Sequence, residues 1–229
     1  MYVTTMKRCI KYWFKVLDMN NTRFVKKCYN MMILDDRNGM SNWASSIRTC
    51  LQSLGFGYVW ENPGAINANH FMNRFVNRLK DIFLQKWHQS INANVKLEFY
   101  VMYKSHFEYE LYLDVLDIRK FRFAYVNFKT SCHDLEIERG RYRNIPRHER
   151  LCKLCDKDVV EDEYHFLLCC EFYKDLRCVY IPEKYRSPCT MHKFKILMST
   201  RNENLIRNIA TYLFHAFNVR KTFLAQNAL

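Results

Sequence analysis

The chain has 229 residues, of which 49% are hydrophobic and 16% aromatic, so it can bury a core and is not a disordered segment. Only 5 Gly and 4 Pro disfavour an all-β fold, which needs many turns. The formal net charge of +13 favours a polyanionic partner, most often nucleic acid.

Apolar residues recur every three or four positions through the first part of the chain, which is the spacing of a buried helix face. This spacing predicts four helices, over about residues 10–17, 25–32, 43–54 and 69–88. Asn42 is suited to cap the third helix and Gly55 to end it. The aromatic residues of the fourth helix share one face, which is typical of core packing.

The middle of the chain is less regular. The stretch 97–103 fits either a short strand or the start of a helix, whereas 110–116 and 119–129 have helical spacing. From Ser131 to Arg150 the pattern predicts a short extended piece and then a basic loop. Further helices are expected over about 171–179 and 191–198, and a final helix follows a capping-box pattern at 200–203.

These elements predict a mainly α fold, a helical array with one zinc knuckle of the Cys-Cys-His-Cys type and at most a short β hairpin. We expect a helical region over residues 1–118. Residues 119–229 would hold the basic segment, the zinc knuckle and the C-terminal helices. The two regions could also form one continuous domain.

A dense group of metal-binding residue types follows the basic segment. Cys152 and Cys155 form a C-x-x-C pair. His165, Cys169 and Cys170 follow further along the same stretch. Two thiolates, an imidazole and a third thiolate complete a tetrahedral set for Zn²⁺. On a continuous helix Cys169 faces the same side as His165, whereas Cys170 is better placed if His165 precedes the first regular turn. The spacing alone leaves both open.

Four protein ligands fill the coordination shell, so we expect a structural zinc ion and no catalysis. Glu161 and Glu163 are the carboxylates that could serve as general bases near such a site. The order of residues differs from that of the zinc deaminases, in which H-x-E precedes P-C-x-x-C. A hydrolytic zinc enzyme is therefore the least favoured interpretation.

The most concentrated positive charge lies just before and within the start of this cysteine and histidine group. Arginine and lysine can bind phosphates, and an interleaved tyrosine can stack on a base. The acidic loop 156–163 would repel phosphate, or it could pair with these arginines instead. The candidate nucleic-acid-binding residues are Arg139, Arg141, Tyr142, Arg143, Arg147, Arg150 and Lys153.

The cellular setting follows from two further features. Two lysines interrupt the apolar run after Arg8, which argues against a signal peptide. No apolar stretch approaches the roughly 20 residues that span a bilayer. We therefore expect an intracellular protein with reduced thiols and no membrane partner.

The stretch from Leu135 to Leu176 resembles a known family. Its segments L-E-I-E-R-G-R-Y, P-R-H-E-R-L-C-K-L-C and V-E-D-E-Y-H-F-L-L-C-C-E-F-Y are similar to the zinc-binding tail of LINE-type (non-LTR) retrotransposon reverse transcriptase polyproteins, and to related invertebrate orphan proteins. The resemblance is weaker upstream of this stretch. The chain lacks the aromatic-x-Asp-Asp motif of the polymerase. Because the family motif ends H-x4-C, the resemblance implies Cys152, Cys155, His165 and Cys170 as the ligands.

The resemblance also implies template recognition in the parent polyprotein. The expected function is therefore zinc-stabilised binding of nucleic acid, RNA rather than DNA, with no small-molecule substrate. The alternative is a zinc-stapled protein-interaction module or a functionless remnant of a retroelement.

Overall fold

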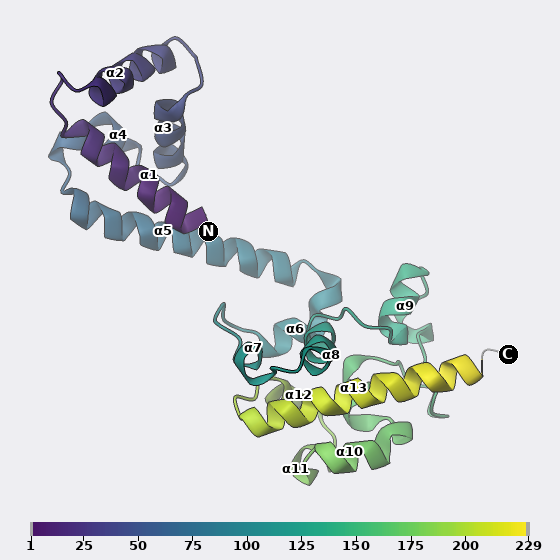
Figure 1. Ribbon diagram of the computed structural model, residues 1–229. Coiled ribbons are helices and arrows are strands. Elements are labelled where there is room, and N and C mark those ends of the chain that lie inside the picture. The colour runs from purple at the N-terminus through teal and green to yellow at the C-terminus, as the bar shows by residue number, and fades with distance from the viewer. Residues whose placement is uncertain (1, 228–229) are drawn as a thin grey trace. The chain divides into compact units, whose positions relative to one another are not determined.

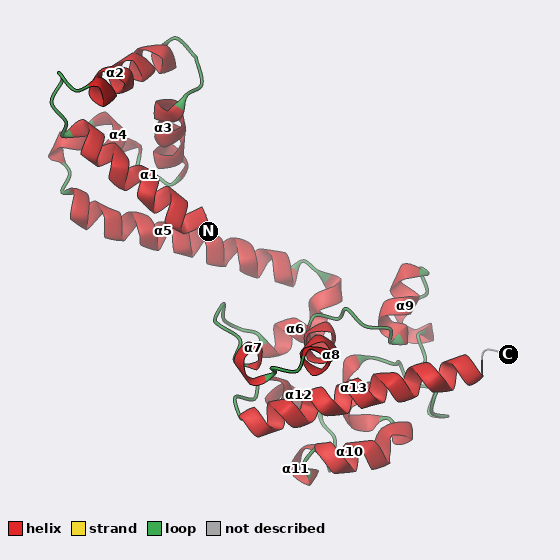
Figure 2. Ribbon diagram, viewed as in Figure 1, coloured by secondary structure: helices red, strands yellow, loops and turns green. Residues whose placement is uncertain are grey.

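The computed structural model describes residues 2–227, and the chain is built from helices joined by loops (Figures 1 and 2). Within this range there is no β-sheet, and the one isolated β-bridge is an antiparallel pair between Leu151 and Val160. The mainly α-helical fold expected from the sequence is confirmed. The sequence analysis allowed at most a short β hairpin, and this bridge is the only β pairing among the described residues.

The chain separates into two compact units, one up to His88 and the other from Gln89 onward. Each unit has its own cluster of buried apolar residues. The boundary that we expected after residue 118 lies inside the second unit. The reason is that Phe99 and Val115, which precede that position, are buried in the second core.

The first unit consists of five helices and one turn of 3-10 helix. These are α1 (Tyr2–Leu17), α2 (Phe24–Arg37), α3 (Trp43–Ser53), α4 (Gly57–Glu61), η1 (Pro63–Ala65) and most of α5 (Ala68–Asn92). Trp13 lies at its centre, stacked on Trp60 with 5.6 Å between ring centroids, and its Nε1 donates to the Tyr29 hydroxyl at 2.9 Å. The hydrogen bond satisfies a polar group that is otherwise buried.

Helix α3 has the two ends that its sequence predicts. The backbone N–H of Ser45 donates to Asn42 Oδ1 at 3.1 Å, and the backbone N–H of Asn42 donates to Ser45 Oγ at 2.7 Å. This is a reciprocal capping box. After the helix, Gly55 adopts a φ of +78°, a left-handed conformation that glycine enters without steric cost.

The second unit contains the rest of the helices. They are η2 (Val95–Leu97), α6 (Glu98–Tyr103), α7 (Tyr112–Val115), α8 (Arg119–Lys129), α9 (Glu136–Tyr142), η3 (Arg147–Glu149), a π-helical turn η4 (His165–Cys169), η5 (Glu171–Tyr173), α10 (Lys174–Tyr180), α11 (Glu183–Arg186), α12 (Met191–Met198) and α13 (Glu203–Gln226). The long helix α13 packs against α7, α8 and α10 (yellow in Figure 1). Ile209, Tyr212, Leu213 and Ala216 on it are fully buried. It therefore forms the axis of this core.

Two local details differ from the sequence-based expectation. Asn202, and not the Thr200 of the expected capping box, caps α13, because its Oδ1 accepts from the Leu205 N–H at 2.9 Å. The stretch expected to be extended contains the short helix α9. The N–H of Glu136 at its start donates to the side chain of Glu161, and the N–H of Ile137 donates to the backbone oxygen of the same residue. A distant residue therefore caps this helix, which no local pattern reveals.

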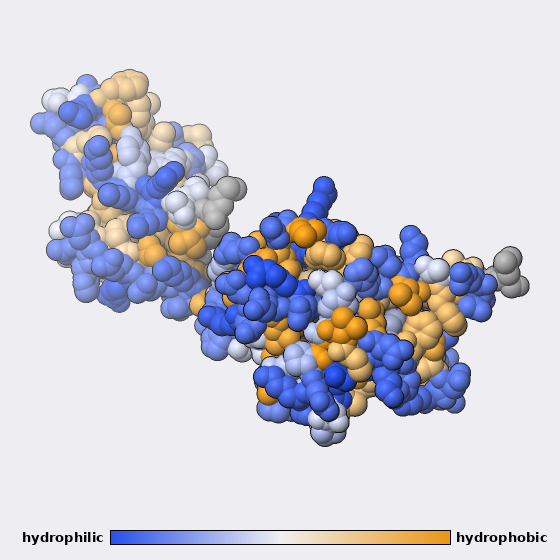
Figure 3. Space-filling view, turned by 60° about the horizontal axis from the view of Figure 1, so that its bottom comes forward, coloured by the Kyte–Doolittle hydropathy of each residue, from blue (hydrophilic) through white to orange (hydrophobic). Residues whose placement is uncertain are grey.

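The face drawn in Figure 3 is mostly hydrophilic, with apolar side chains grouped in patches between the charged ones. Such a mixture is ordinary for a folded protein surface. No helix within residues 2–227 combines the length and the apolar character needed to cross a bilayer.

Candidate metal centre

Cys152, Cys155, His165 and Cys170 come together in the second unit. Their ligand atoms all lie within 4.8 Å of one another. The Sγ atoms of Cys152 and Cys170 are 3.9 Å apart, and Cys155 Sγ is 3.4 Å from His165 Nε2. A tetrahedral Zn²⁺ would separate two sulfurs by about 3.8 Å and a sulfur from a nitrogen by about 3.5 Å. The cluster could therefore hold a metal ion, and its spacing fits a tetrahedral one.

The backbone around the first two cysteines forms the rigid side of the site. Cys152 N–H donates to the Val159 oxygen at 2.9 Å, and Glu161 N–H donates to the Arg150 oxygen at 2.9 Å. These two bonds clamp the chain on either side of the C-x-x-C turn. Between them, Asp158 takes a positive φ of 47° where the loop reverses. Asp and Asn tolerate this conformation better than most residues.

The other two ligands lie at the two ends of a widened helical turn. Asp162 Oδ1 accepts from the His165 N–H at 2.8 Å and so caps the turn. Cys170 N–H donates to the His165 oxygen at 2.8 Å, which is the i to i+5 bond of a π-helix. Such turns often occur at functional sites. The extra residue places Cys170 on the side of His165.

The same turn directs Cys169 elsewhere. Its Sγ lies 3.3 Å from the Sγ of Cys189, in the loop before α12. The ambiguity that the spacing left between Cys169 and Cys170 is therefore resolved by the geometry in favour of Cys170. Cys169 instead forms a half-buried thiol pair with Cys189.

The site is closed to solvent on most sides. His165 is 6% exposed, Cys152 8% and Cys170 0%. The hydrogen bond from Cys170 lowers the pKa of the Cys152 thiol, and the same bond together with burial raises the pKa of Cys170. Burial also raises the pKa of Cys155. A metal ion that binds here must displace the protons that the Cys155 and Cys170 thiols hold.

The segment that carries the Cys₃His cluster is part of the core and not an appendage to it. Phe166, next to His165, is fully buried and stacks on Phe217 of α13 at 4.7 Å. Tyr212 of the same helix donates to the Phe166 oxygen at 2.9 Å. Buried Arg177 donates to the Leu167 oxygen at 2.9 Å and to the Cys170 oxygen at 2.6 Å. Arg177 thus orients a ligand-bearing turn, a role that no spacing in the sequence signals.

Glu161 does not face the site as a general base would. It is 1% exposed, and both of its oxygens accept from Arg220 of α13, at 2.8 and 2.6 Å. Planar guanidinium and carboxylate groups match in such a two-bond arrangement. The pair joins the end of the metal-binding loop to the helix that forms the axis of the core.

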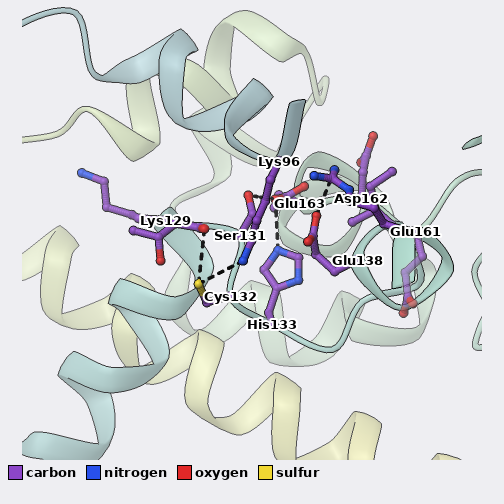
Figure 4. Close-up of polar contacts among 12 residues, drawn as sticks. Lys96, Lys129, Ser131, Cys132, His133, Glu138, Glu161, Asp162 and Glu163 are labelled. Atoms are coloured by element: carbon purple, nitrogen blue, oxygen red, sulfur yellow. Dashed lines mark hydrogen bonds and ion pairs between the residues drawn. The ribbon is translucent and has the colours of Figure 1, made fainter. Parts of the chain in front are cut away.

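Glu163 is also committed to a structural contact (Figure 4). Its Oε1 accepts from Ser131 Oγ at 2.6 Å and lies 3.0 Å from His133 Nε2. Burial alone would raise the pKa of Glu163, but His133 and Ser131 outweigh it and hold the pKa below its usual value. Of the loop's carboxylates, only those of Asp156 and Asp158 are exposed. The acidic loop therefore repels an approaching phosphate less than its sequence suggests.

The candidate nucleic-acid-binding residues divide into three groups. Arg139 and Lys153 lie 3.8 and 3.3 Å from a carboxylate oxygen of Glu136, and Arg141 lies 3.1 Å from Glu138. The two glutamate side chains are 5% and 3% exposed, whereas the three cations are 27% to 51% exposed. The positive groups therefore cover the negative ones, and the outward face remains cationic.

Arg147 and Arg150 form the second group, which is held by contacts within the protein. Arg150 donates to the backbone oxygens of Ile145 and Ile137, at 2.9 and 2.8 Å. Its guanidinium is thus a structural clamp over α9. Arg147 pairs with Glu98 and lies 3.8 Å from Asp162. Neither side chain can move to a phosphate without giving up these bonds.

Tyr142 and Arg143 form the third group. Tyr142 is 80% exposed at the end of α9, and Arg143 follows it on the surface. Among the described residues Arg143 has no ion-pair partner. Of the predicted nucleic-acid-binding residues, these two can contact a ligand without giving up an ion pair within the protein.

The fold and the site together define a mainly α-helical protein with a Cys₃His cluster able to hold a metal ion. Comparison with family models, with curated proteins and with solved structures finds no match for this chain. The resemblance noted in the sequence therefore remains a prediction.

Proposed function

We propose that this chain binds nucleic acid, RNA in preference to DNA, and that a structural Zn²⁺ in the Cys₃His cluster stabilises the unit that does so. The zinc proposal is supported by the donor set, because three thiols and one imidazole are ligands that zinc prefers. A structural role is favoured because four donors leave no open position for water or substrate.

The cationic outer face of α9 and the segment after it carries the nucleic-acid proposal. There Arg139, Arg141 and Lys153 lie over buried carboxylates, while Tyr142 and Arg143 are exposed without such partners. The carboxylate of Glu136 lies near three cations, because Arg220 is 3.5 Å from it in addition to Arg139 and Lys153. A phosphate that approaches this face meets guanidinium and ammonium groups first. The resemblance to retrotransposon tails points the same way and would make the chain a derivative of such a polyprotein.

A salt titration tests this proposal. Labelled single-stranded RNA should bind the zinc-loaded chain with an affinity that falls steeply with salt, because binding releases counterions from phosphates. Arg143→Ala should weaken binding and lower the slope of log K against log salt by about 0.7 for the lost contact. Arg207→Ala is the matched control, since Arg207 is an exposed arginine of α13 that pairs with Glu203.

The result that would overturn the proposal is the absence of RNA binding at low salt by folded, zinc-loaded protein. An equal effect of the two substitutions would remove the assignment to α9. Failure to bind RNA would favour a protein-interaction role for the zinc-stapled unit. A duplex DNA of the same length, titrated in parallel, tests the preference for RNA.

A further inference from the structure

A groove runs between α8 and α13, within the second unit. It encloses about 410 Å³, which lies within the range of pockets that hold small organic ligands, about 300–1,000 Å³. From α8 it is lined by Lys120, Phe123, Ala124 and Asn127, which share one face of that helix. From α13 it is lined by residues at the same spacing, Phe214, Phe217, Asn218, Lys221 and Leu224.

The walls of this groove are aromatic. Phe123 is 65% exposed, so its ring is accessible to a ligand. Phe214 lies opposite on α13, and Phe217 stacks on buried Phe166, so its ring is fixed from behind. The groove therefore offers π faces on which a planar ring can stack.

The charges around the groove are mostly positive. Lys120, Arg139, Arg220 and Lys221 line it, against the single carboxylate of Asp134. Arg220 is neutralised by Glu161, but among the described residues Lys120 and Lys221 have no ion-pair partner. Lys120 instead lies 4.9 Å above the ring of Phe214. A cation beside an aromatic wall suits a ligand that carries both a planar ring and an anionic group.

The remaining polar lining comprises Cys132, His133 and two amides. Asn127 projects from α8 and Asn218 from α13, both into the lining. An amide side chain presents a donor and an acceptor, which is what the edge of a nucleobase requires of a partner. A simple aliphatic anion would use the lysines but leave the amides and the rings without a role.

From this lining we propose that the groove holds one nucleoside phosphate, with the base against Phe123 and Phe214 and the phosphate at Lys120 and Lys221. The nucleotide belongs to an RNA strand, so the inference rests on the proposed function and names a second place where the strand is held. A free nucleotide has the same chemistry, and the experiment separates the two sources.

The test uses the full chain loaded with zinc and a single-stranded RNA that carries 5-iodouridine. Irradiation should cross-link the RNA to a peptide that contains Phe123 or Phe214, identified by mass spectrometry. Phe123→Ala should weaken RNA binding by roughly 5- to 150-fold, because a base–aromatic stack contributes about 1–3 kcal/mol. Phe24→Ala, at an aromatic residue of the first unit that is 80% exposed, is the control and should leave affinity unchanged.

A charge-matched pair completes the design. Lys221→Ala should weaken binding and lower its salt dependence, whereas Lys195→Ala, at an exposed lysine of α12 outside the groove, should not. Circular dichroism of each variant verifies that it is folded. Because Phe123 and Lys221 are exposed, neither substitution removes core packing.

Equilibrium dialysis with uridine 5′-monophosphate distinguishes the outcomes. RNA binding that is unaffected by Phe123→Ala, with cross-links elsewhere, overturns the groove assignment but leaves the proposed function standing. Binding of the free nucleotide that depends on Phe123, without RNA binding, keeps the groove as a nucleotide site but overturns the RNA strand as its source, and with it the proposed function. If neither ligand binds, both proposals are wrong.

Discussion

At the scale of single residues, the clearest distinction lies between two neighbouring cysteines. Cys170 is fully buried and faces Cys152, whereas Cys169 faces Cys189. The π-helical turn that begins at His165 produces this difference, because it sets the spacing of ligands at five residues. Identical side chains at adjacent positions therefore have different chemical roles.

Substituting each of these cysteines separately tests that assignment. Cys170→Ser should reduce bound zinc to well below one ion per chain, because a serine hydroxyl is a poor replacement for a thiolate ligand. Cys169→Ser should retain one ion, and it serves as the control for loss of a thiol at this point of the chain. Metal analysis after gel filtration is the measurement. Retention of zinc by Cys170→Ser together with its loss from Cys169→Ser would reverse the ligand assignment.

At the scale of secondary-structure elements, α9 depends on a close approach between a glycine and an arginine. A Cβ atom on Gly140 would lie 2.5 Å from Cγ and 2.7 Å from Cδ of Arg150. The arginine cannot move away freely, because its guanidinium holds the oxygens of Ile137 and Ile145. Gly140 therefore permits the clamp that ties α9 to the loop that follows it.

Gly140→Ala should lower the free energy of unfolding by about 1–3 kcal/mol, the usual cost of forcing an extra carbon into a packed site. Urea denaturation followed by circular dichroism measures the change. In an Arg150→Ala background the same substitution should cost much less, since the clashing side chain is gone. Equal costs in the two backgrounds would show that the contact with Arg150 does not constrain Gly140.

At the scale of the whole molecule, the chain combines two separate cores, and the Cys₃His cluster belongs to one of them. Cys152 and Cys170 are members of the second core, together with residues of α8 and α13. The first core contains no residue of the Cys₃His cluster. Removal of a bound metal ion should therefore change the structure of the second unit only.

Chelation of the metal tests this independence in the intact chain. All four tryptophans, at positions 13, 43, 60 and 87, lie in the first unit. Chelation should reduce helical circular dichroism, because structural zinc contributes directly to folding, while tryptophan emission should stay unchanged. Zn²⁺ should restore the lost signal and Mg²⁺ should not, since Mg²⁺ prefers oxygen ligands. A shift of tryptophan emission in parallel with the helical signal would contradict independent units.

Helices with a regular apolar face were predictable from the sequence, and so was the composition of the metal cluster. The helix at 119–129 is α8 to the residue, and the helix at 191–198 is α12. The four ligands lie within a short stretch, so their types and spacing were informative before folding was considered. Helix α9 was missed because Glu161 caps it from outside its own segment. Its alternating Leu135 and Ile137 are typical of a strand, although both are simply buried.

What the sequence by itself determined is therefore local: helical periodicity, the cap at Asn42, the stop at Gly55 and the donor set for a metal. Only the tertiary structure decided which charges remain available. Glu161 is paired with Arg220, and Arg150 is bound to backbone oxygens. Nothing in the sequence distinguishes these three residues from charged residues that are exposed. Burial and pairing depend on segments far apart in the chain. For the same reason the groove between α8 and α13 has no signature in either helix alone.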